Sequence, residues 1–245
     1  MGKVFAILGD IHSNLEALKA VLNDCEKNGV TDYLCTGDIV GYNANPKECL
    51  DIIRSLQIPA VMGNHDYYVS TRQDLSLFNK DAAFGVQWTR RQLSISDIHY
   101  LRALPFSMTK MGFSVVHSTW DNPEGFGYVF DNFQADTNFV NQKTPISFHG
   151  HTHLPVIYMR DSGAGGVKCY EAQDFKIEPG KKYFINVGSV GQPRDGNPRS
   201  SYVIFHQAEK VVRFRRLEYD IESAQRRILE AGLPERLAYR LGTGE

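Results

Sequence analysis

Residues 3–14 read KVFAILGDIHSN, and this stretch decides how the fold begins. A run of strand-forming apolar residues breaks at a glycine and is followed at once by Asp10 and His12. The next segment places its apolar residues on one face of a helix, with Ser13 as the expected N-cap and an end near Gly29. The stretch therefore predicts a β-strand, a polar loop and an amphipathic helix.

The same arrangement, an apolar run that ends in polar side chains, occurs four more times along the chain. In open α/β sheets, ligands bind in the crevice beyond the carboxyl ends of the strands. We therefore expect the polar groups after all five runs to converge on one crevice. The four further runs, YLCTG, AVMG, FSVV and ISF, are followed by Asp38; by Asn64, His65 and Asp66; by His117; and by His149, His151 and His153.

Each of these residues also has a purely structural explanation. Asp10 can cap a helix, Asp38 can occupy a turn, and His117 can be a hydrogen-bonded histidine of the core. However, six of the eight histidines follow an apolar run, and a glycine directly precedes Asp10, Asp38, Asn64 and His151. Glycine permits the close backbone approach that a binding site needs. The joint pattern therefore favours a functional site.

The order of the apolar runs predicts the fold class. Strands at residues 32–37 and 58–63 alternate with helices, the second of which begins at Pro46. A mostly helical stretch then extends from Leu77 to Leu104. Strand, helix and strand in this order are typical of a parallel sheet with right-handed crossovers.

The later part of the chain has a different pattern. A hairpin is predicted to turn at Met111 and Gly112, and short runs between residues 155 and 219 predict a second, more antiparallel sheet. Residues 220–245 are expected to form a terminal helix and a tail. We predict an α/β fold in one domain of residues 1–245, a four-layer αββα sandwich of two mixed β-sheets flanked by helices.

The composition limits the class of protein. The 245 residues are 42% hydrophobic, and 27 basic side chains balance 28 acidic ones, so no global field attracts nucleic acid or an anionic membrane. The first apolar run is too short for a signal peptide, and no run approaches the roughly 18 apolar residues of a membrane span. The four cysteines form no CxxC pair. We interpret them as free thiols of a cytoplasmic protein.

Five ordered motifs between residues 9 and 153 carry a resemblance to a known family. Together they resemble the calcineurin-like metallophosphoesterases. The segment GSVGQPRDG at residues 188–196 also resembles a bacterial and archaeal subgroup related to diadenosine tetraphosphatases. The five motifs are D-x-H (Asp10, His12), G-D (Asp38), G-N-H-D (Asn64, His65, Asp66), a histidine after a strand (His117) and G-H-x-H (His151, His153).

The resemblance implies a centre of two divalent or trivalent transition-metal ions. A mixture of imidazole, carboxylate and amide ligands suits Mn, Fe, Zn or Ni, of which Mn is favoured. Two ions about 3.5–4 Å apart hold a phosphoryl group and acidify a water molecule, so that hydroxide attacks phosphorus in line. One ion would be bound by Asp10, His12, Asp38 and His153, and the other by Asp38, Asn64, His117 and His151, with Asp38 as the bridge.

The resemblance also assigns residues beside the ligands. His65 would be the general acid that protonates the leaving group. Asp66 would orient the His65 ring, or it only caps the turn. Ser118 stands where the family more often has a glycine and can crowd the substrate side. For the additional His149, a buried, hydrogen-bonded position in the core is favoured over a position behind the ligands or a contact with substrate.

The substrate is less tightly defined by the sequence. Arg194 can reach a second phosphate of the substrate or form a surface salt bridge. Trp120, Phe126 and Tyr128 can stack on a nucleobase or pack within their own loop. We expect a hydrolase of phosphodiester or phosphoanhydride bonds in small, nucleotide-like molecules.

Other functions remain possible on the same fold. The alternatives are a Ser/Thr phosphoprotein phosphatase and a non-catalytic scaffold. A nuclease would require a basic groove, which the balanced charge does not favour. The sequence leaves a homo-oligomer possible.

Overall fold

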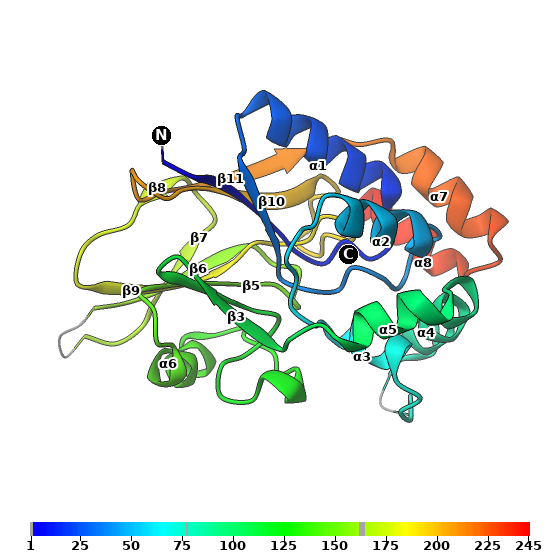
Figure 1. The fold of residues 1–245 in the computed structure, drawn as a ribbon, viewed down its shortest axis with the longest axis horizontal. Coiled ribbons are helices and arrows are strands. Elements are labelled where there is room, and N and C mark those ends of the chain that lie inside the picture. Colours follow the sequence, from blue (N-terminus) through cyan, green and yellow to red (C-terminus); the bar gives the residue numbers. More distant parts are fainter. Residues whose placement is uncertain (1, 77, 162–164) are drawn as a thin grey trace.

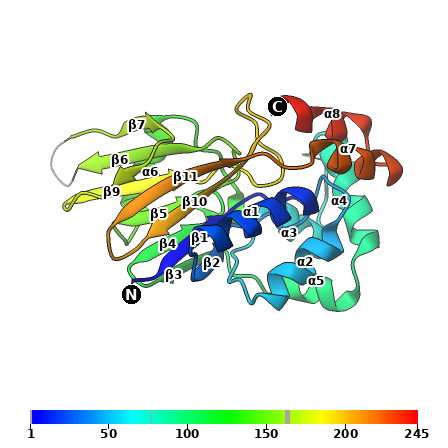
Figure 2. The same ribbon diagram turned by 90° about the horizontal axis from the view of Figure 1, so that it is seen from above.

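The computed structural model describes residues 2–76, 78–161 and 165–245. Two mixed β-sheets stack face to face, with helices outside them (Figure 1). The predicted four-layer αββα class is therefore confirmed. The helices α2 to α5, α7 and α8 gather beyond one end of the sheets (Figure 2).

The first sheet joins the beginning of the chain to its last strands. Its order is β2-β1-β10-β11-β8, in which β1 is parallel to β2 and antiparallel to β10. The sequence predicted that β10 and β11 belong to the second sheet. This prediction is wrong, because both strands pair within the first sheet. The bounds are β1 Val4–Leu8, β2 Asp32–Cys35, β8 Phe175–Lys176, β10 Ser200–His206 and β11 Val211–Leu217.

The second sheet has the order β3-β4-β5-β9-β6-β7, with parallel pairing from β4 through β5 to β9. The predicted hairpin is confirmed, because β3 and β4 pair antiparallel across Met111 and Gly112, which both have a positive φ. The bounds are β3 Ser107–Lys110, β4 Phe113–Val116, β5 Ile146–His149, β6 Val156–Asp161, β7 Lys168–Glu171 and β9 Lys181–Asn186.

Helices cover the outer faces of both sheets. Helix α6 packs on β6 and β9 of the second sheet, and α1 packs on β10 of the first. Apolar side chains of both sheets, among them Phe5, Phe148 and Phe205, form the core between them. The helices are α1 Leu15–Lys27, α2 Pro46–Ser55, α3 Asn64–Ser70, α4 Lys80–Gln92, α5 Ile95–Arg102, α6 Asn132–Asn141, α7 Ile221–Glu230 and α8 Glu235–Thr243, with a short 3-10 turn at Pro123–Gly125.

Three local predictions differ from the structure. The cap of α1 is Asn14, whose side chain accepts from the Ala17 amide, and not Ser13. The run at 58–63 forms a single bridge from Ala60 to Cys35, because the chain turns into α3 directly afterwards. The expected C-terminal tail instead contains α8, which buries an apolar face.

An ion pair fastens α1 to the first sheet. Asp24 accepts two bonds from Arg215 at 2.8 and 2.9 Å and one from the Tyr202 hydroxyl at 2.7 Å. Burial alone would raise the pKa of Asp24, but these bonds outweigh it and hold the pKa below 3.8. A lowered carboxyl pKa adds stability above its unfolded value, and that stability is lost as the pH falls through the folded value.

We therefore expect Asp24→Asn to lower the free energy of unfolding by about 1–2 kcal/mol at pH 7. The difference from wild type should vanish in acid, below the ordinary carboxyl pKa of 3.8. Urea unfolding at several pH values measures both effects. Asp51→Asn is the control, because Asp51 is exposed and, among the described residues, pairs only with Lys47 on the same helix. Equal losses in the two variants would contradict the prediction.

Candidate metal centre

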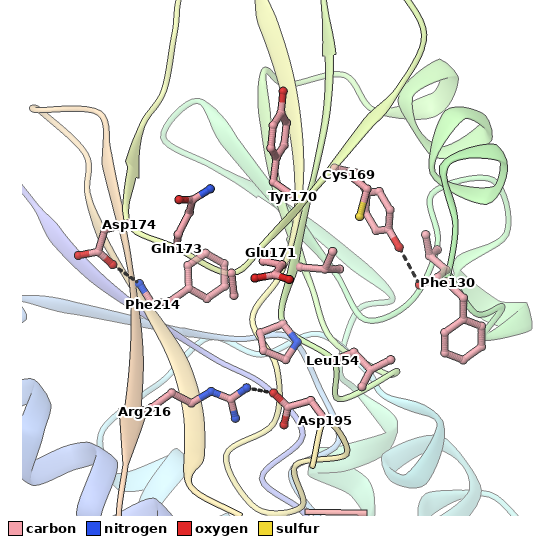
Figure 3. Close-up of a pocket in the computed structure, with 15 residues that line it drawn as sticks. Phe130, Leu154, Cys169, Tyr170, Glu171, Gln173, Asp174, Asp195, Phe214 and Arg216 are labelled. Atoms are coloured by element: carbon pink, nitrogen blue, oxygen red, sulfur yellow. Dashed lines mark hydrogen bonds and ion pairs between the residues drawn. The ribbon is translucent and has the colours of Figure 1, made fainter. Parts of the chain in front are cut away.

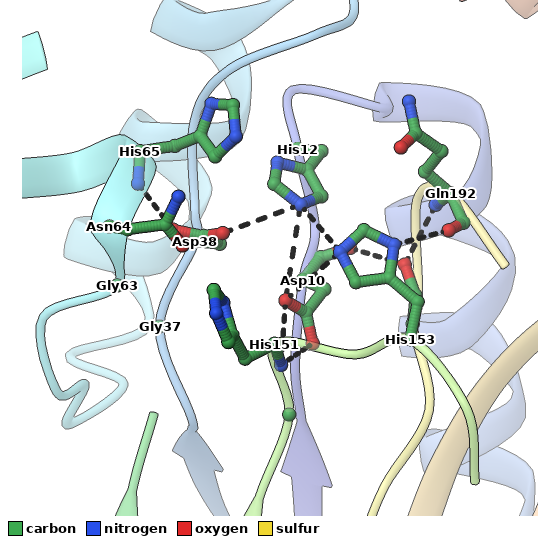
Figure 4. Close-up of polar contacts among 12 residues, drawn as sticks. Asp10, His12, Gly37, Asp38, Gly63, Asn64, His65, His151, His153 and Gln192 are labelled. Atoms are coloured by element: carbon green, nitrogen blue, oxygen red, sulfur yellow. Dashed lines mark hydrogen bonds and ion pairs between the residues drawn. The ribbon is translucent and has the colours of Figure 1, made fainter. Parts of the chain in front are cut away.

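The predicted site residues meet where the two sheets adjoin. Asp10 and His12 follow β1, Asp38 follows β2, and His117 follows β4. His151 and His153 follow β5, while Asn64 and His65 begin α3. Backbone bonds such as Asp10 N to Gly37 O and Gly150 N to His117 O join the loops within each sheet. The Asp10 carboxylate accepts from the amide of His151, at 3.0 and 3.2 Å, and so links the sheets (Figure 4).

The first cluster contains Asp10, His12 and His153, whose donor atoms lie close enough to hold one cation. The two histidine Nε2 atoms are 3.0 Å apart, and His153 Nε2 is 3.3 Å from Asp10 Oδ1. Each ring turns its Nδ1 towards a carbonyl oxygen, that of Val40 for His12 and that of Gln192 for His153.

Those carbonyl contacts decide where the ring protons lie. A carbonyl only accepts, so each Nδ1 carries the proton. Burial first, and then the neighbouring His153, lower the pKa of His12 well below its usual range, so this ring is neutral. Its Nε2 therefore presents a lone pair to that of His153. Two lone pairs at 3.0 Å repel one another, and a cation between them removes the repulsion.

The second cluster contains Asp38, His117 and His151. His117 Nε2 is 3.1 Å from both His151 Nδ1 and Asn64 Oδ1. His117 Nδ1 donates to the Thr36 carbonyl at 2.8 Å, so its Nε2 is again the free lone pair. Within the described part of the chain, the buried Nε2 of His151 has no hydrogen-bond partner. The atoms that face one another here, His117 Nε2, His151 Nδ1 and the Asp38 carboxylate, form a donor set that fits a second cation.

Asp38 lies between the two clusters. Its Oδ2 is 3.5 Å from both His12 Nε2 and His117 Nε2. Burial, together with the carboxylates of Asp66 and Asp10, raises the pKa of Asp38 well above its usual range. A charged carboxylate is costly in such a position unless a cation compensates it.

The backbone is strained at the same residues. A positive φ is uncommon for residues other than glycine, and such strain concentrates at functional sites. In the described chain, eleven non-glycine residues have one, and five of them are predicted ligands. These five are Asp10, His12, Asp38, His151 and His153, with φ between 48° and 70°.

Two glycines allow the carboxylates to approach the backbone. A Cβ on Gly63 would lie 2.1 Å from Asp38 Oδ1, and one on Gly150 would lie 2.2 Å from Asp10 Oδ2. Any larger residue would displace these oxygens. The close approach expected from the sequence is therefore present at both positions.

His65 lies beside the first cluster. Its ring centre is 4.8 Å from that of His12 and 4.3 Å from that of Tyr42. No described residue bonds to its buried Nδ1, while its backbone amide donates to Asp38 Oδ1 at 2.8 Å. Burial, and next the charge of Arg194, lower the pKa of His65 well below its usual range.

Asp66 does not have the contact expected from the sequence. Its carboxylate accepts from the amides of Val40 and Gly63, both at 3.2 Å, and completes the capping of α3. The structure therefore supports the alternative of a turn cap. In the described chain no hydrogen bond joins Asp66 to the His65 ring, so the expected orientation of that ring by Asp66 stays a prediction.

The remaining candidates divide between packing and the rim of the site. His149 is buried and stacks on Phe184 with ring centres 3.8 Å apart, and burial lowers its pKa to about 3. Trp120 donates to Ser147, which fits packing. Tyr128 is 49% exposed and stacks on His151, with ring centres 4.2 Å apart. Of the three loop aromatics, Tyr128 is thus the one that stacks on a predicted ligand.

The other two positions are Ser118 and Phe126. Ser118 is buried, and its hydroxyl has no partner in the described chain. The Phe126 ring lies 6.1 Å from that of His117.

Arg194 has no carboxylate partner among the described residues. One of its nitrogens donates to Gln192 Oε1, and its guanidinium lies over the Tyr42 ring. It lines a cavity of about 500 Å³ together with Lys80, Arg236 and Arg240. Sequence reasoning missed these three cations, because no motif marks them.

A larger cavity of about 670 Å³ lies elsewhere, between β6 and β7 on one side and β11 on the other (Figure 3). Glu171, Phe214 and Arg216 help to line it, and Arg216 pairs there with Asp195. None of the predicted ligands lines it. The candidate centre is therefore defined by its donor atoms and not by the size of a cavity.

Two stacked mixed sheets thus carry candidate metal ligands, histidines and carboxylates, at their strand ends. The chain belongs to the calcineurin-like phosphoesterase superfamily, whose domain model matches residues 4–210. An uncharacterized protein of Methanocaldococcus jannaschii is 40% identical over 245 residues, with 98% of each chain covered.

Solved structures share the fold. A metallophosphoesterase from Sphaerobacter thermophilus is 39% identical, covers both chains completely and gives a TM-score of 0.89. A putative diadenosine tetraphosphatase is 15% identical, with 89% of this chain and 95% of that chain covered and a TM-score of 0.50, a likeness of fold alone. Among the described residues, no helix has the length and apolar character needed to cross a membrane.

Proposed function

We propose that this protein is a binuclear metal-dependent phosphoesterase that hydrolyses phosphodiester or phosphoanhydride bonds of small, nucleotide-like substrates. The observation that carries the proposal is the position of Asp38 Oδ2, 3.5 Å from one histidine of each cluster. One carboxylate can then serve two ions. Asp10, His12 and His153 complete the first set of ligands, and Asn64, His117 and His151 complete the second.

When bound, two such ions supply Lewis acidity towards a phosphoryl group and acidify water enough to give a nucleophile near neutral pH. The protein holds the ligands in place. The carbonyls of Val40, Thr36 and Gln192 fix the tautomers of three histidines. His65 donates the proton that the leaving oxygen needs.

The reaction class is supported by kinship, because the relative from Sphaerobacter thermophilus is a metallophosphoesterase at 39% identity over the whole chain. A nucleotide-like substrate is supported by the rim of the centre. Arg194 offers a fork that matches phosphoryl oxygens. Tyr42 and Tyr128 offer ring faces beside the ligands.

Cysteine usage supports a reducing compartment. Cys25, Cys35 and Cys49 are buried free thiols, and Cys169 is an exposed one. Burial raises the pKa of Cys25 to about 12, which keeps that thiol protonated and unreactive. We therefore assign the protein to the cytoplasm.

The test combines metal analysis with a panel of substrates. Protein stripped with a chelator and reconstituted with Mn²⁺ should bind two ions per chain. It should then hydrolyse bis-nitrophenyl phosphate and dinucleoside tetraphosphates faster than mononucleotides or a phosphopeptide. A preference for the phosphopeptide would favour a phosphoprotein phosphatase. Protein that binds no metal and hydrolyses nothing would be a scaffold.

A further inference from the structure

The cavity beside the metal centre carries an excess of positive charge. It encloses about 500 Å³, and its charged lining consists of Lys80, Arg194, Arg236 and Arg240 against the single carboxylate of Asp81. These residues come from the start of α4, the loop before β10 and α8. We call this space the basic cavity.

The basic cavity adjoins the metal centre. Tyr42 and Tyr128 line it. The Tyr42 ring is 4.7 Å from that of His12, and the Tyr128 ring is 4.2 Å from that of His151. Each of the two tyrosines therefore borders both the basic cavity and a predicted ligand of the centre.

Among the described residues, none of the four cations of the basic cavity forms an ion pair with an acidic side chain, although the charge of Asp81 acts on Arg240. The Nε of Arg194 is buried and has no partner in the described chain. Arg240 donates to the backbone oxygen of Glu245. Burial, and next the charge of Arg194, lower the pKa of Arg240 to about 10. The guanidinium groups of Arg194 and Arg240 repel one another, and an anion bound between them would offset this repulsion.

Helix α8, which carries Arg236 and Arg240, is packed against its neighbours. Leu237, Ala238 and Leu241 are buried in a cluster that also contains Tyr42 and residues of α7. This helix lies beyond residue 210, where the match to the family domain ends. The chain thus adds cations from outside that domain to the edge of the centre.

We propose that the basic cavity binds a second phosphoryl group of the substrate, joined through a phosphate chain to the one at the metal centre. This inference rests on the proposed function and narrows it to substrates with two or more linked phosphates. Guanidinium groups match phosphoryl oxygens with two parallel N–H donors. The volume of the cavity is within the range of ordinary ligand sites.

The first test measures binding without metal. Inorganic tripolyphosphate would be titrated calorimetrically into chelator-treated protein, as wild type, Arg240→Gln, Arg236→Gln and Arg226→Gln. Loss of a charged hydrogen-bonding partner should weaken binding by about tenfold to a hundredfold in the first two variants. Arg226 is the control, because it is an exposed arginine of α7 that does not line the cavity.

The second test measures kcat/KM on Mn²⁺-loaded protein. Arg240→Gln should lower kcat/KM for a dinucleoside tetraphosphate and for tripolyphosphate by a larger factor than for bis-nitrophenyl phosphate. A loss confined to the dinucleotide would assign the cations to the nucleoside and overturn the proposal. The proposal would also be overturned if wild type did not bind tripolyphosphate, or if both α8 variants bound it as tightly as wild type. Arginine-dependent binding without any turnover would instead refute the phosphoesterase and retain the phosphate site.

Discussion

Asp38→Asn is expected to leave the purified protein without either metal ion and to lower kcat/KM at least about a hundredfold. Its Oδ2 lies 3.5 Å from one histidine of each cluster, so a single substitution affects both sets of donors. Asparagine keeps the shape but removes the negative charge and one of the two oxygens. Metal analysis by mass spectrometry, with titration of Mn²⁺ into stripped protein, measures the loss.

The same substitution should stabilise the metal-free protein. Asp38 is buried close to the carboxylates of Asp10 and Asp66, and a neutral amide removes part of their mutual repulsion. Wild type should gain thermal stability on addition of Mn²⁺, because a ligand that binds only the folded state stabilises it. Asp38→Asn should start from a higher Tm and gain little.

Two comparisons make this result specific. Asp51→Asn removes an exposed carboxylate from α2 and should behave as wild type in both assays. A variant of Asp38 that keeps one ion at full occupancy would show that Asp38 belongs to a single set of ligands. The bridging assignment would then be wrong.

The convergence of the site could be predicted because its information is local. Each polar group follows its own apolar run by one to four residues. The positions of Asp10, Asp38, His117 and His151 could therefore be predicted from the strand ends alone. The rule for parallel strands then brought them to one edge. The strand predicted before Asn64 is only a single bridge in the structure. Asn64 still reaches the site, because the bridge from Ala60 to Cys35 holds the chain beside β2.

Sheet membership was not predictable in the same way. Strands β10 and β11 have apolar patterns that suit either sheet, and the choice depends on pairing between β1 and β10, about two hundred residues apart. Helix α8 was predicted as part of a tail, because its apolar residues are buried only by packing against α7, which the sequence does not show. The basic cavity was missed for the same reason, since Lys80 and Arg240 meet through tertiary packing alone.

His65→Ala is expected to retain both metal ions and to lower turnover of substrates with an alkoxide leaving group by about 10²–10⁴. The side chain has no partner in the described chain at its Nδ1. The contact with Asp38 comes from the backbone amide of His65, which alanine keeps. The ligands should therefore stay in position while the proton donor is lost.

The leaving group distinguishes proton donation from other roles of His65. A nitrophenolate leaves without a proton, so His65→Ala should affect nitrophenyl esters far less than alkyl phosphodiesters. Burial and Arg194 keep the free imidazole neutral, and the negative charge of a bound phosphate favours the protonated ring that donation requires. Equal losses on both kinds of ester would exclude a general acid. Loss of metal would instead make His65 a ligand, because its ring also lies within reach of a cation shared with His12 and Asp38.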